Sequence, residues 1–544
     1  EVMQTTSFLS KIRVTLLTLV TLFVVSCSGN RVQTGNLVIL LVDGCSSSSL
    51  SVARWYRSAV DSLPRQLNLD PYLCGYVDVS SSVSPITGSS ESMSAFMTGY
   101  RTGAGYVSML PAAGRYGDML PVDTSRAYQP LATILEAAKA QGKSTGMVVT
   151  VEYLHATPAA CAAHSKSRYK RDAIGCQIAS QNLDLLYGGG RSYLSDDVRG
   201  ILAENGTTLI EDDLEAFRAC EDPRQWAIFA DTDMRFEIDR DSTREPSLAE
   251  MTAKALRQLS KNRKGFFLMV EGSKVDYAAH ANDPAAHIKD LLAFDDAVGE
   301  VLDFARKDGN TTVIILPDHG TAGMTIGSGR LEYYAAKPLA EHFGPIAGYK
   351  ASAQYLSELI MAAPAEDVRG IVREYCGIEI SAEEEALLLE HKNNVTEDYM
   401  TALYDPTLQG KIAQLMSGRT NIGYSSGTHT AEDVFLAIYH PRGLRPEGWI
   451  ANTDLANYMT EVLGMDEPLD SLTADYFCKA SELFEGYECS VEGDTLTVRS
   501  ASHTLSIPAN RSWVMVDSLK KEIPSVTVLA EGEFYVNRSL KQLL

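Results

Sequence analysis

Short apolar runs alternate with amphipathic segments along residues 36–330, and this alternation predicts strands separated by helices. The expected strands are residues 37–42, 146–151, 266–270 and 312–316. The expected helices are residues 131–140, 248–259 and 285–305. Strands that alternate with helices are typical of a mostly parallel sheet with helices on both faces. The pattern therefore predicts an α/β fold.

The pattern changes twice after residue 330. Residues 331–425 are rich in Tyr and Ala, then acidic, with helical periodicity near Leu387–Leu389, so we expect a mostly helical insertion over the crevice of the sheet. A strand pattern returns at residues 434–439, and from residue 467 short alternating runs at 495–498 and 504–507 indicate β-structure. We therefore expect a catalytic domain over 36–466, with the insertion inside it, and a small β-rich module over 467–544.

The N-terminal residues have the pattern of an export signal. Lys11 and Arg13 precede an apolar run, residues 14–25, that is short for a membrane span but suits a signal peptide. The run ends in Val-Val-Ser-Cys, which resembles a bacterial lipobox with Cys27 as the lipidated residue. We expect a signal peptide over 1–27, a tether over 28–35 and lipid anchoring to a bacterial membrane, in the periplasm or at the cell surface. An uncleaved N-terminal anchor is the alternative.

Composition narrows the classes of partner. The chain has 544 residues, of which 22% are charged and 45% hydrophobic, an ordinary globular balance. Its formal net charge of −22 disfavours nucleic acid and anionic membrane surfaces as partners, because both require basic patches. An anionic substrate would need local positive charge, which metal ions could supply.

The cysteines are compatible with an exported protein. Nine occur, and eight remain once Cys27 is set aside. An oxidising compartment permits disulfides, so Cys478 with Cys489 is a plausible bridge and Cys161 with Cys176 a weaker one. Because no C-x-x-C motif occurs, a thiolate zinc site is not expected.

Polar residues follow three of the predicted strands directly. Asp43 follows the first, Glu271 follows the strand at 266–270, and Asp318 with His319 follows the strand at 312–316. Open α/β sheets bind ligands at the carboxyl ends of their strands, so these side chains should converge on one crevice. Helix capping could explain Asp43 alone, but it does not explain the set.

The segment Val270–His280 has the spacing of a metal site. Asp276 and His280 are four residues apart, so a helix would place both on one face where they can bind one divalent cation. Glu271 lies at the end of the preceding strand and is free to serve a second metal. Acidic residues beside an apolar strand are costly unless a cation compensates their charge.

Three other segments add candidate functional groups. Ser89 stands where a helix is expected to begin, a position that favours an anion but is also an ordinary N-cap position. His155 and Thr157 are followed by Arg168, although a lone arginine is usually a solvated surface charge. His429 lies in a loop before the strand at 434–439.

Together these segments resemble the alkaline phosphatase family, metal-dependent phosphomonoesterases with a serine nucleophile. The resemblance covers residues 37–440 in the family's order, interrupted by the insertion. The matching stretches are LVILLVDG, TGSSESMSAFMTGYRTGAG, TVEYLHATPAACAAHSKSR, LLYGGGR, GFFLMVEGSKVDYAAHANDP, LAFDDAV, VIILPDHGTAGMT and GTHTAEDVFLAIY.

The resemblance implies two Zn²⁺ ions and one Mg²⁺ ion. The implied ligands of one zinc are Asp276, His280 and His429, those of the other are Asp43, Asp318 and His319, and those of magnesium are Asp43, Thr157 and Glu271. Ser89 corresponds to the nucleophile and Arg168 to the phosphate-binding arginine. The resemblance leaves His155 as a residue that tunes the magnesium site or binds substrate through water. Small phosphorylated molecules are the implied substrates, and because members commonly form dimers the resemblance allows a homodimer.

The chain departs from the family near the nucleophile. Gly88 stands where members commonly have the aspartate that helps to orient the arginine, and Ser90 and Ser92 are alternative nucleophiles if the register is shifted. A related hydrolase of phosphodiesters, sulfate esters or phosphonates is therefore the alternative function. A lipoprotein that binds ligands without catalysis is the alternative from a different functional class.

Overall fold

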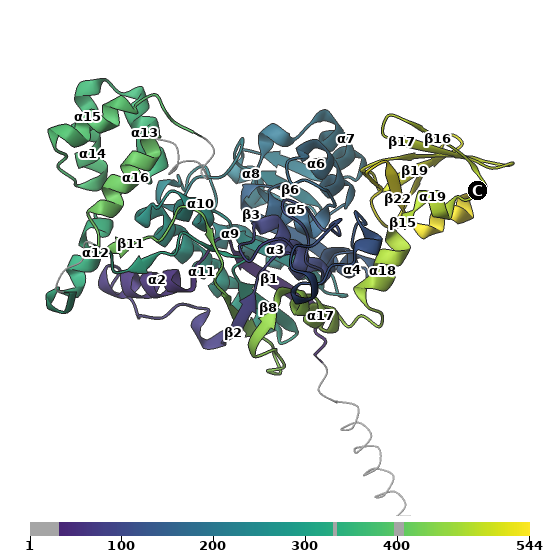
Figure 1. The fold of residues 1–544 in the computed structure, drawn as a ribbon, viewed down its shortest axis with the longest axis horizontal. Coiled ribbons are helices and arrows are strands. Elements are labelled where there is room, and N and C mark those ends of the chain that lie inside the picture. The colour runs from purple at the N-terminus through teal and green to yellow at the C-terminus, as the bar shows by residue number, and fades with distance from the viewer. Residues whose placement is uncertain (1–31, 330–333, 397–406) are drawn as a thin grey trace, which may run out of the picture.

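The computed structural model describes residues 32–329, 334–396 and 407–544 (Figure 1). Its centre is a ten-stranded sheet in which the neighbours of β13 run antiparallel to it and all other adjacent strands are parallel. In spatial order the strands are β14 (Gly448–Ala451), β2 (Leu73–Asp78), β13 (Val434–Tyr439), β8 (Thr311–Leu316), β1 (Asn36–Val42), β7 (Phe266–Gly272), β3 (Ser144–Glu152), β4 (Leu185–Gly189), β6 (Gln225–Ile228) and β5 (Thr208–Glu211). The predicted α/β fold with a mostly parallel sheet is confirmed.

Alternate residues of the central strands feed two hydrophobic cores, one on each face of the sheet. Leu37, Ile39 and Leu41 of β1 face one core, and Val38 and Leu40 face the other. The helices that pack into the first core are α3 (Ser89–Thr98), α4 (Ile134–Ala140), α5 (Ala156–Ala162), α6 (Arg171–Ser180), α7 (Asp196–Glu204) and α17 (Asn452–Leu463). Those that pack into the second are α2 (Ser47–Ala59), α8 (Leu214–Ala219), α9 (Leu248–Leu259) and α11 (Pro284–Asp308). Burial on both faces explains why these strands are apolar throughout.

Capping residues set where the helices begin. The hydroxyl of Ser247 accepts a hydrogen bond from the backbone N–H of Glu250, so α9 begins at the predicted residue. Helix α4 begins at Ile134, three residues later than predicted, because Thr133 and Glu136 form a reciprocal capping box there. Helix α11 begins one residue early and ends three residues late, where Gly309 adopts a left-handed conformation.

The residues of the predicted insertion form helices in the part that the structure describes. These are α12 (Leu339–Ala347), α13 (Ala353–Ala362), α14 (Val368–Cys376), α15 (Ala382–Glu390) and α16 (Leu408–Gly418). They surround a hydrophobic core of their own, which reaches Tyr56 of α2 and Ile288 of α11. Figure 1 shows them as a lobe beside the central sheet. The boundaries 331 and 425 stay a prediction.

The C-terminal residues are β-rich, as predicted. After α18 (Leu469–Tyr476) the chain forms a three-stranded and a five-stranded sheet, and the short helix α19 (Ala480–Leu483) follows the first strand of the three-stranded sheet. The first sheet contains β15 (Cys478–Lys479), β22 (Glu533–Val536) and β21 (Val528–Ala530). The second contains β16 (Glu488–Glu492), β17 (Thr495–Arg499), β18 (Thr504–Pro508), β19 (Trp513–Val516) and β20 (Leu519–Glu522). Phe477 anchors this part to the sheet-bearing domain by packing against the ring of His164, with 4.6 Å between the ring centroids.

The predicted disulfides are wrong. All eight cysteines in the described part of the chain are free thiols. Cys478 lies in the three-stranded sheet and Cys489 in the five-stranded sheet, so their closeness in sequence does not bring them together. The thiol of Cys161 instead donates a hydrogen bond to the carbonyl of Thr157 within α5.

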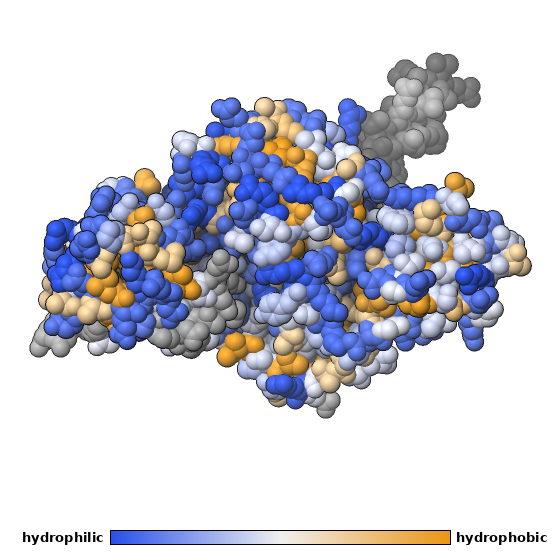
Figure 2. Space-filling view, turned by 90° about the horizontal axis from the view of Figure 1, so that it is seen from above, coloured by the Kyte–Doolittle hydropathy of each residue, from blue (hydrophilic) through white to orange (hydrophobic). Residues whose placement is uncertain are grey.

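The predicted signal peptide, 1–27, and Cys27 lie outside the described residues. None of the helices in residues 32–329, 334–396 and 407–544 combines the length and apolar character of a membrane span. Figure 2 shows hydrophilic residues over much of the face seen from above, with smaller hydrophobic areas between them.

Candidate active site

The carboxyl ends of three adjacent strands bring the predicted acidic residues together. Strands β8, β1 and β7 are neighbours and run parallel, so Asp318, Asp43 and Glu271 emerge at the same edge of the sheet. All three side chains are fully buried. Convergence on one crevice, expected from the positions of these residues in the sequence, is therefore what the fold produces.

Helix α10 (Lys274–His280) places Asp276 and His280 on one face, as their spacing predicts, with Nε2 of His280 3.3 Å from Oδ2 of Asp276. The short strand β12 (His429–Thr430) pairs with β9 (Gly320–Thr321), which brings His429 from a distant part of the chain. Its Nε2 lies 3.9 Å from Oδ1 of Asp276. These three side chains form the first group that could hold a metal ion.

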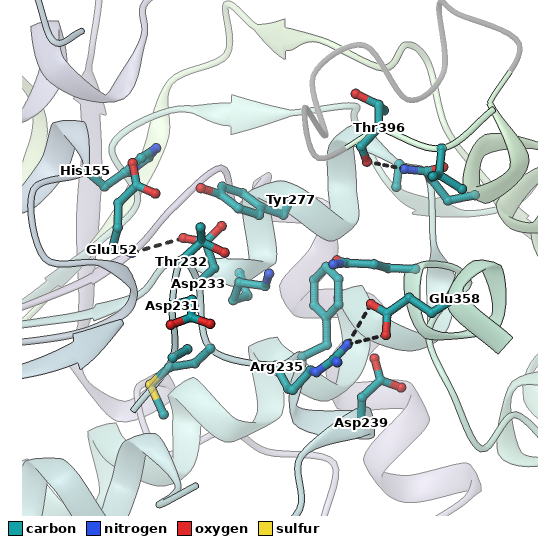
Figure 3. A pocket seen from close by; sticks show the side chains of 18 of the residues that line it. Glu152, His155, Asp231, Thr232, Asp233, Arg235, Asp239, Tyr277, Glu358 and Thr396 are labelled. Atoms are coloured by element: carbon teal, nitrogen blue, oxygen red, sulfur yellow. Dashed lines mark hydrogen bonds and ion pairs between the residues drawn. The ribbon is translucent and has the colours of Figure 1, made fainter. Parts of the chain in front are cut away.

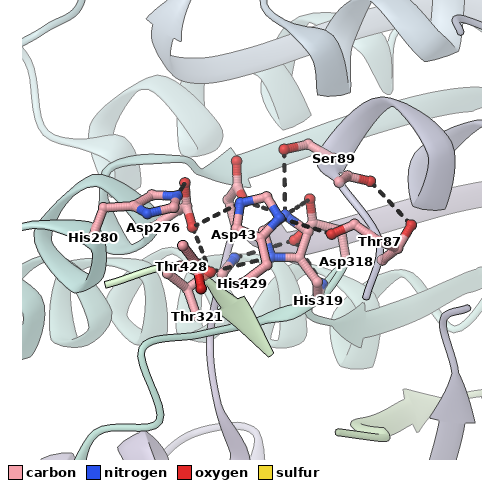
Figure 4. Close-up of polar contacts among 12 residues, drawn as sticks. Asp43, Thr87, Ser89, Asp276, His280, Asp318, His319, Thr321, Thr428 and His429 are labelled. Carbon is pink, nitrogen blue, oxygen red and sulfur yellow. Dashed lines mark hydrogen bonds and ion pairs between the residues drawn. The ribbon is translucent and has the colours of Figure 1, made fainter. Parts of the chain in front are cut away.

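The second group contains Asp43, Asp318 and His319. Nε2 of His319 lies 3.5 Å from Oδ1 of Asp43 and 3.4 Å from Oδ2 of Asp318. Figure 4 shows the first two groups side by side, with the ring of His429 stacked on that of His319 at a centroid distance of 3.7 Å.

The third group contains Asp43, Glu271 and His155, and the first two belong to the magnesium set that the resemblance implies. One carboxylate oxygen of each acid and a ring nitrogen of His155 lie within 4.8 Å of one another. Thr157 is fully buried in α5, close enough to Glu271 to affect its ionisation. Burial and the charge of Asp318 raise the pKa of the Glu271 carboxyl to about 8, and the Thr157 hydroxyl opposes that rise.

Two backbone carbonyls orient the imidazoles of the first group. The Nδ1–H of His280 donates to the carbonyl of Gly427 at 2.7 Å, and the Nδ1–H of His429 donates to the carbonyl of Thr87 at 2.7 Å. Both Nε2 atoms are thereby left as the metal-facing atoms. The hydroxyl of Thr321 also donates to Oδ1 of Asp276 at 2.6 Å. Sequence reasoning missed these contacts, because backbone carbonyls carry no signal in a side-chain motif.

The electrostatics of the site fit bound cations. Burial, followed by the charge of Asp318, raises the pKa of Asp43 well above its usual range. Burial and the charge of Asp276 likewise raise the pKa of Asp318 to about 7. Both carboxylate oxygens of Asp43 and of Glu271 are buried and accept no hydrogen bond from any described residue. Buried carboxylates are costly in this state, and metal ions would compensate both the charge and the missing contacts.

Ser89 is the serine that faces the second group. It is the first residue of α3, and its Oγ lies 3.4 Å from Nε2 of His319 (Figure 4). The Ser90 hydroxyl donates instead to Oε2 of Glu91 at 2.8 Å, and the Ser92 hydroxyl donates to the backbone carbonyl of Asp318 at 2.7 Å. The geometry therefore disfavours the two alternative registers.

Gly88 precedes Ser89 and leaves room for a neighbouring carboxylate. A Cβ atom at this position would lie 2.8 Å from Oε2 of Glu91. Oε1 of Glu91 accepts the backbone N–H of Gly105 at 2.9 Å, and the carbonyl of Gly105 accepts the backbone N–H of Arg168 at 2.8 Å. Glu91 thus connects the helix of Ser89 to the loop of Arg168.

Arg168 lies beside His155, with Nη2 of the arginine donating to Nε2 of the histidine at 2.8 Å. Burial and the charge of Arg168 lower the pKa of His155 well below its usual range, so the imidazole is neutral and can accept this hydrogen bond. The ring of Tyr277 packs edge-on against His155, with 6.0 Å between the centroids. A cavity of about 890 Å³ opens beside these three residues (Figure 3).

Comparison with known proteins identifies the family. The sequence model of the family described as "Alkaline phosphatase" matches residues 34–465. Alkaline phosphatase 4 of Bacillus subtilis (strain 168) is 30% identical over 448 residues, which cover 80% of this chain and 90% of that protein. The alkaline phosphatase of Escherichia coli (strain K12) is 29% identical, covering 54% of this chain and 71% of that protein.

Solved structures of alkaline phosphatases have a fold similar to that of this chain. The structure of Thermus thermophilus alkaline phosphatase has a TM-score of 0.70 and 25% identity, covering 80% of this chain and 93% of that chain. The cold-active alkaline phosphatase of the psychrophile Shewanella sp. has a TM-score of 0.67 and 27% identity, covering 79% and 99%. The fold and the sequence match lead to one conclusion: the chain belongs to the alkaline phosphatase family.

Proposed function

We propose that this enzyme hydrolyses phosphate monoesters to an alcohol and inorganic phosphate through a phosphoserine intermediate on Ser89. Family membership makes the protein a metal-dependent phosphoric monoester hydrolase; the nucleophile and the ions are the proposal. The observation that carries it is the 3.4 Å approach of Ser89 Oγ to Nε2 of His319, beside the buried carboxylates of Asp43 and Asp318.

We propose two zinc ions and one magnesium ion as the cofactors. One zinc would be held by Asp276, His280 and His429, and the other by Asp43, Asp318 and His319. Oxygen-rich surroundings suit magnesium, which Asp43, Thr157 and Glu271 would hold with His155 nearby. When bound, the zinc ions lower the pKa of neighbouring hydroxyl groups and stabilise negative charge on oxygen.

The protein's own groups position the ester for attack. The guanidinium of Arg168 can bind two phosphoryl oxygens in a bidentate manner, while His155 holds one of its nitrogens in place. The Ser89 oxygen forms a bond to phosphorus as the bond from phosphorus to the alcohol oxygen breaks, and the alcohol leaves with a proton. Water then cleaves the phosphoserine, which releases phosphate and restores the hydroxyl.

The main alternative function is that of a related hydrolase of phosphodiesters, sulfate esters or phosphonates. A catalytically inactive binding protein is a second, less favoured alternative. A monoester has three unsubstituted oxygens, so the fork of Arg168 can bind two of them and leave the third for a metal ion, whereas a diester has only two; this favours monoesters. Ligand groups for three metals, all present in the described residues, argue against a degenerate site.

The test compares three substrates that share one leaving group: 4-nitrophenyl phosphate, bis(4-nitrophenyl) phosphate and 4-nitrophenyl sulfate. We expect kcat/KM to be highest for the monoester by orders of magnitude, and activity to be lost with a chelator and restored by zinc and magnesium. A higher kcat/KM for the diester or sulfate would favour the alternative hydrolase. Bound zinc with no turnover of any of the three would favour the binding protein.

We also propose that Cys27 anchors the enzyme to a bacterial membrane through a lipid, and that its substrates are small phosphorylated molecules. In a bacterial host, Cys27→Ala should move the activity from the membrane fraction to the soluble fraction. Activity that stays with the membrane in that variant would contradict the lipid anchor.

A further inference from the structure

One of the basic side chains that line the cavity beside Arg168 differs from the others in its contacts. Among the described residues four basic side chains line it, and three are engaged: Arg168 with His155 at 2.8 Å, Arg171 with Glu152 at 2.7 Å and Arg235 with Glu358 at 2.7 Å. Figure 3 shows the contacts between Arg235 and Glu358 among the residues that line the cavity. The fourth, Lys274, has no hydrogen bond or close ion pair with a described residue, although the carboxylates of Asp233 and Asp290 are near enough to interact with its charge.

Lys274 is held in place by aromatic rings. Only 3% of the residue is exposed, and its Nζ lies 4.2 Å from the ring centroid of Phe236 and 4.7 Å from that of Tyr277. Ring faces stabilise the positive charge but accept no conventional hydrogen bond. The rings and the charges of Asp233 and Asp290 compensate the ammonium charge but leave its N–H donors available to a ligand in the cavity.

The charge on the cavity wall decides what kind of acceptor fits. Seven acidic side chains and four basic ones line the cavity among the described residues, so an anionic group would be repelled. The carboxylates of Asp233, Asp239 and Glu245 each accept a backbone N–H, from Glu152, Ser352 and Arg235. Asp233 and Asp239 also interact with the side chains of Tyr277 and Ser352, but a carboxylate has about four acceptor sites and can accept a further donor. A hydroxyl group meets both needs, because it accepts from Lys274 and donates to a carboxylate without adding charge.

We propose that this cavity binds the alcohol part of the substrate, that this part is a sugar or polyol, and that Lys274 donates hydrogen bonds to its hydroxyl groups. The proposal rests on phosphomonoester hydrolysis at Ser89 and names the substrate class. The cavity begins at His155 and Arg168, where the phosphoryl group would lie, and its volume of about 890 Å³ can enclose a small ligand.

The test uses two esters of similar length, glucose 6-phosphate and hexyl phosphate, with wild type and Lys274→Met. Methionine keeps the length and apolar stem of lysine but has no donor. We expect wild type to prefer glucose 6-phosphate, and Lys274→Met to lower kcat/KM for that ester by about tenfold to a hundredfold, the range for a hydrogen bond to a charged group. For hexyl phosphate we expect a change within about twofold, because an alkyl chain offers no partner to lose.

Two further variants serve as controls. In Lys289→Met the lost ammonium group also lies over a ring, 4.9 Å from the centroid of Tyr56, but outside the cavity lining, so both esters should be unaffected. Lys274→Arg keeps donors at the same position and should keep most of the preference for the sugar ester.

Three results would overturn the proposal. The first is an equal kcat/KM of wild type for the two esters. The second is an equal decrease of both rates in Lys274→Met with unchanged metal content. The third is a preference of wild type for 3-phosphoglycerate over glucose 6-phosphate that is absent in Lys274→Met. The last result would identify an anion site instead. If wild type hydrolysed none of these esters, phosphomonoester hydrolysis itself would fail, so the two failures are distinguishable.

Discussion

Ser89 Oγ and Nε2 of His319 lie 3.4 Å apart, although 230 residues separate them in the sequence. The serine begins helix α3 and the histidine follows strand β8, so two elements on the same edge of the sheet bring them together. The neighbouring hydroxyls of Ser90 and Ser92 are engaged by Glu91 and by the backbone of Asp318. This relationship favours Ser89 over Ser90 and Ser92 as the proposed nucleophile.

Removing the Ser89 hydroxyl should stop turnover without emptying the site. We expect Ser89→Ala to lower kcat on 4-nitrophenyl phosphate by at least about a thousandfold, because covalent catalysis is lost, while zinc content stays near the wild-type level. Ser90→Ala is the matched control and should keep most of the activity, since that hydroxyl contacts Glu91. Full activity in Ser89→Ala would place the nucleophile elsewhere.

Replacing Asp43 should reduce the number of bound metal ions more than replacing His429 does. The aspartate belongs to two of the three ligand groups, whereas the histidine belongs to one. We therefore expect purified Asp43→Ala to contain at least one metal ion fewer per chain than His429→Ala, as measured by elemental mass spectrometry after equal dialysis. Identical metal contents in the two variants would contradict the shared position of Asp43.

Arg168 should bind phosphate through its fork of donors rather than through its charge alone. Lysine keeps the charge but cannot make two parallel hydrogen bonds to phosphoryl oxygens or donate to His155 in the same geometry. We expect Arg168→Lys to lower kcat/KM by roughly tenfold to a hundredfold, the value of one charge-assisted hydrogen bond, and to weaken inhibition by inorganic phosphate. Unchanged phosphate inhibition would show that the guanidinium does not contact phosphate.

Asp239 should make stability depend on pH in a predictable direction. Burial raises the pKa of this carboxyl from 3.8 to about 6, although the backbone N–H of Ser352 opposes the rise. A carboxyl that binds its proton more tightly in the folded state contributes stability at low pH, and that contribution is lost as pH rises from about 4 to 6. Asp239→Asn has no such loss, and its amide oxygen can still accept the Ser352 N–H.

The melting temperature of Asp239→Asn relative to wild type should therefore be higher at pH 8 than at pH 4.5, by about 1–3 °C. Calorimetry of both proteins at the two pH values, with the same metal concentrations, measures the difference. A relative melting temperature that falls between pH 4.5 and pH 8 would mean that the carboxylate is stabilised by folding instead.

Periodicity and spacing were enough to predict the sheet and to identify most of the candidate metal ligands. Parallel strands end at a common edge, so Asp43, Glu271 and Asp318 could be expected to meet from their positions after apolar runs. Helical spacing alone placed Asp276 beside His280. These predictions depend on local geometry that every regular strand or helix shares.

Other parts of the site depend on how distant segments meet, which no local pattern encodes. His429 reaches the site only because β12 pairs with β9, and its orientation depends on the carbonyl of Thr87. The position of His155 beside Asp43, and that of Lys274 in the cavity, likewise follow from tertiary packing. The roles of Ser89 and Arg168 were inferred from the family resemblance. The disulfide predictions were wrong because closeness in sequence does not place two cysteines in one sheet.

The most direct test of the central claim is to trap the covalent intermediate. Enzyme mixed with a phosphate monoester and quenched in acid should carry one phosphoryl group, and peptide mass spectrometry should locate it on Ser89, with no such peptide from Ser89→Ala. A phosphoryl group on Ser90, Ser92 or another residue, or turnover with no phosphorylated peptide at any quench time, would contradict the proposed mechanism.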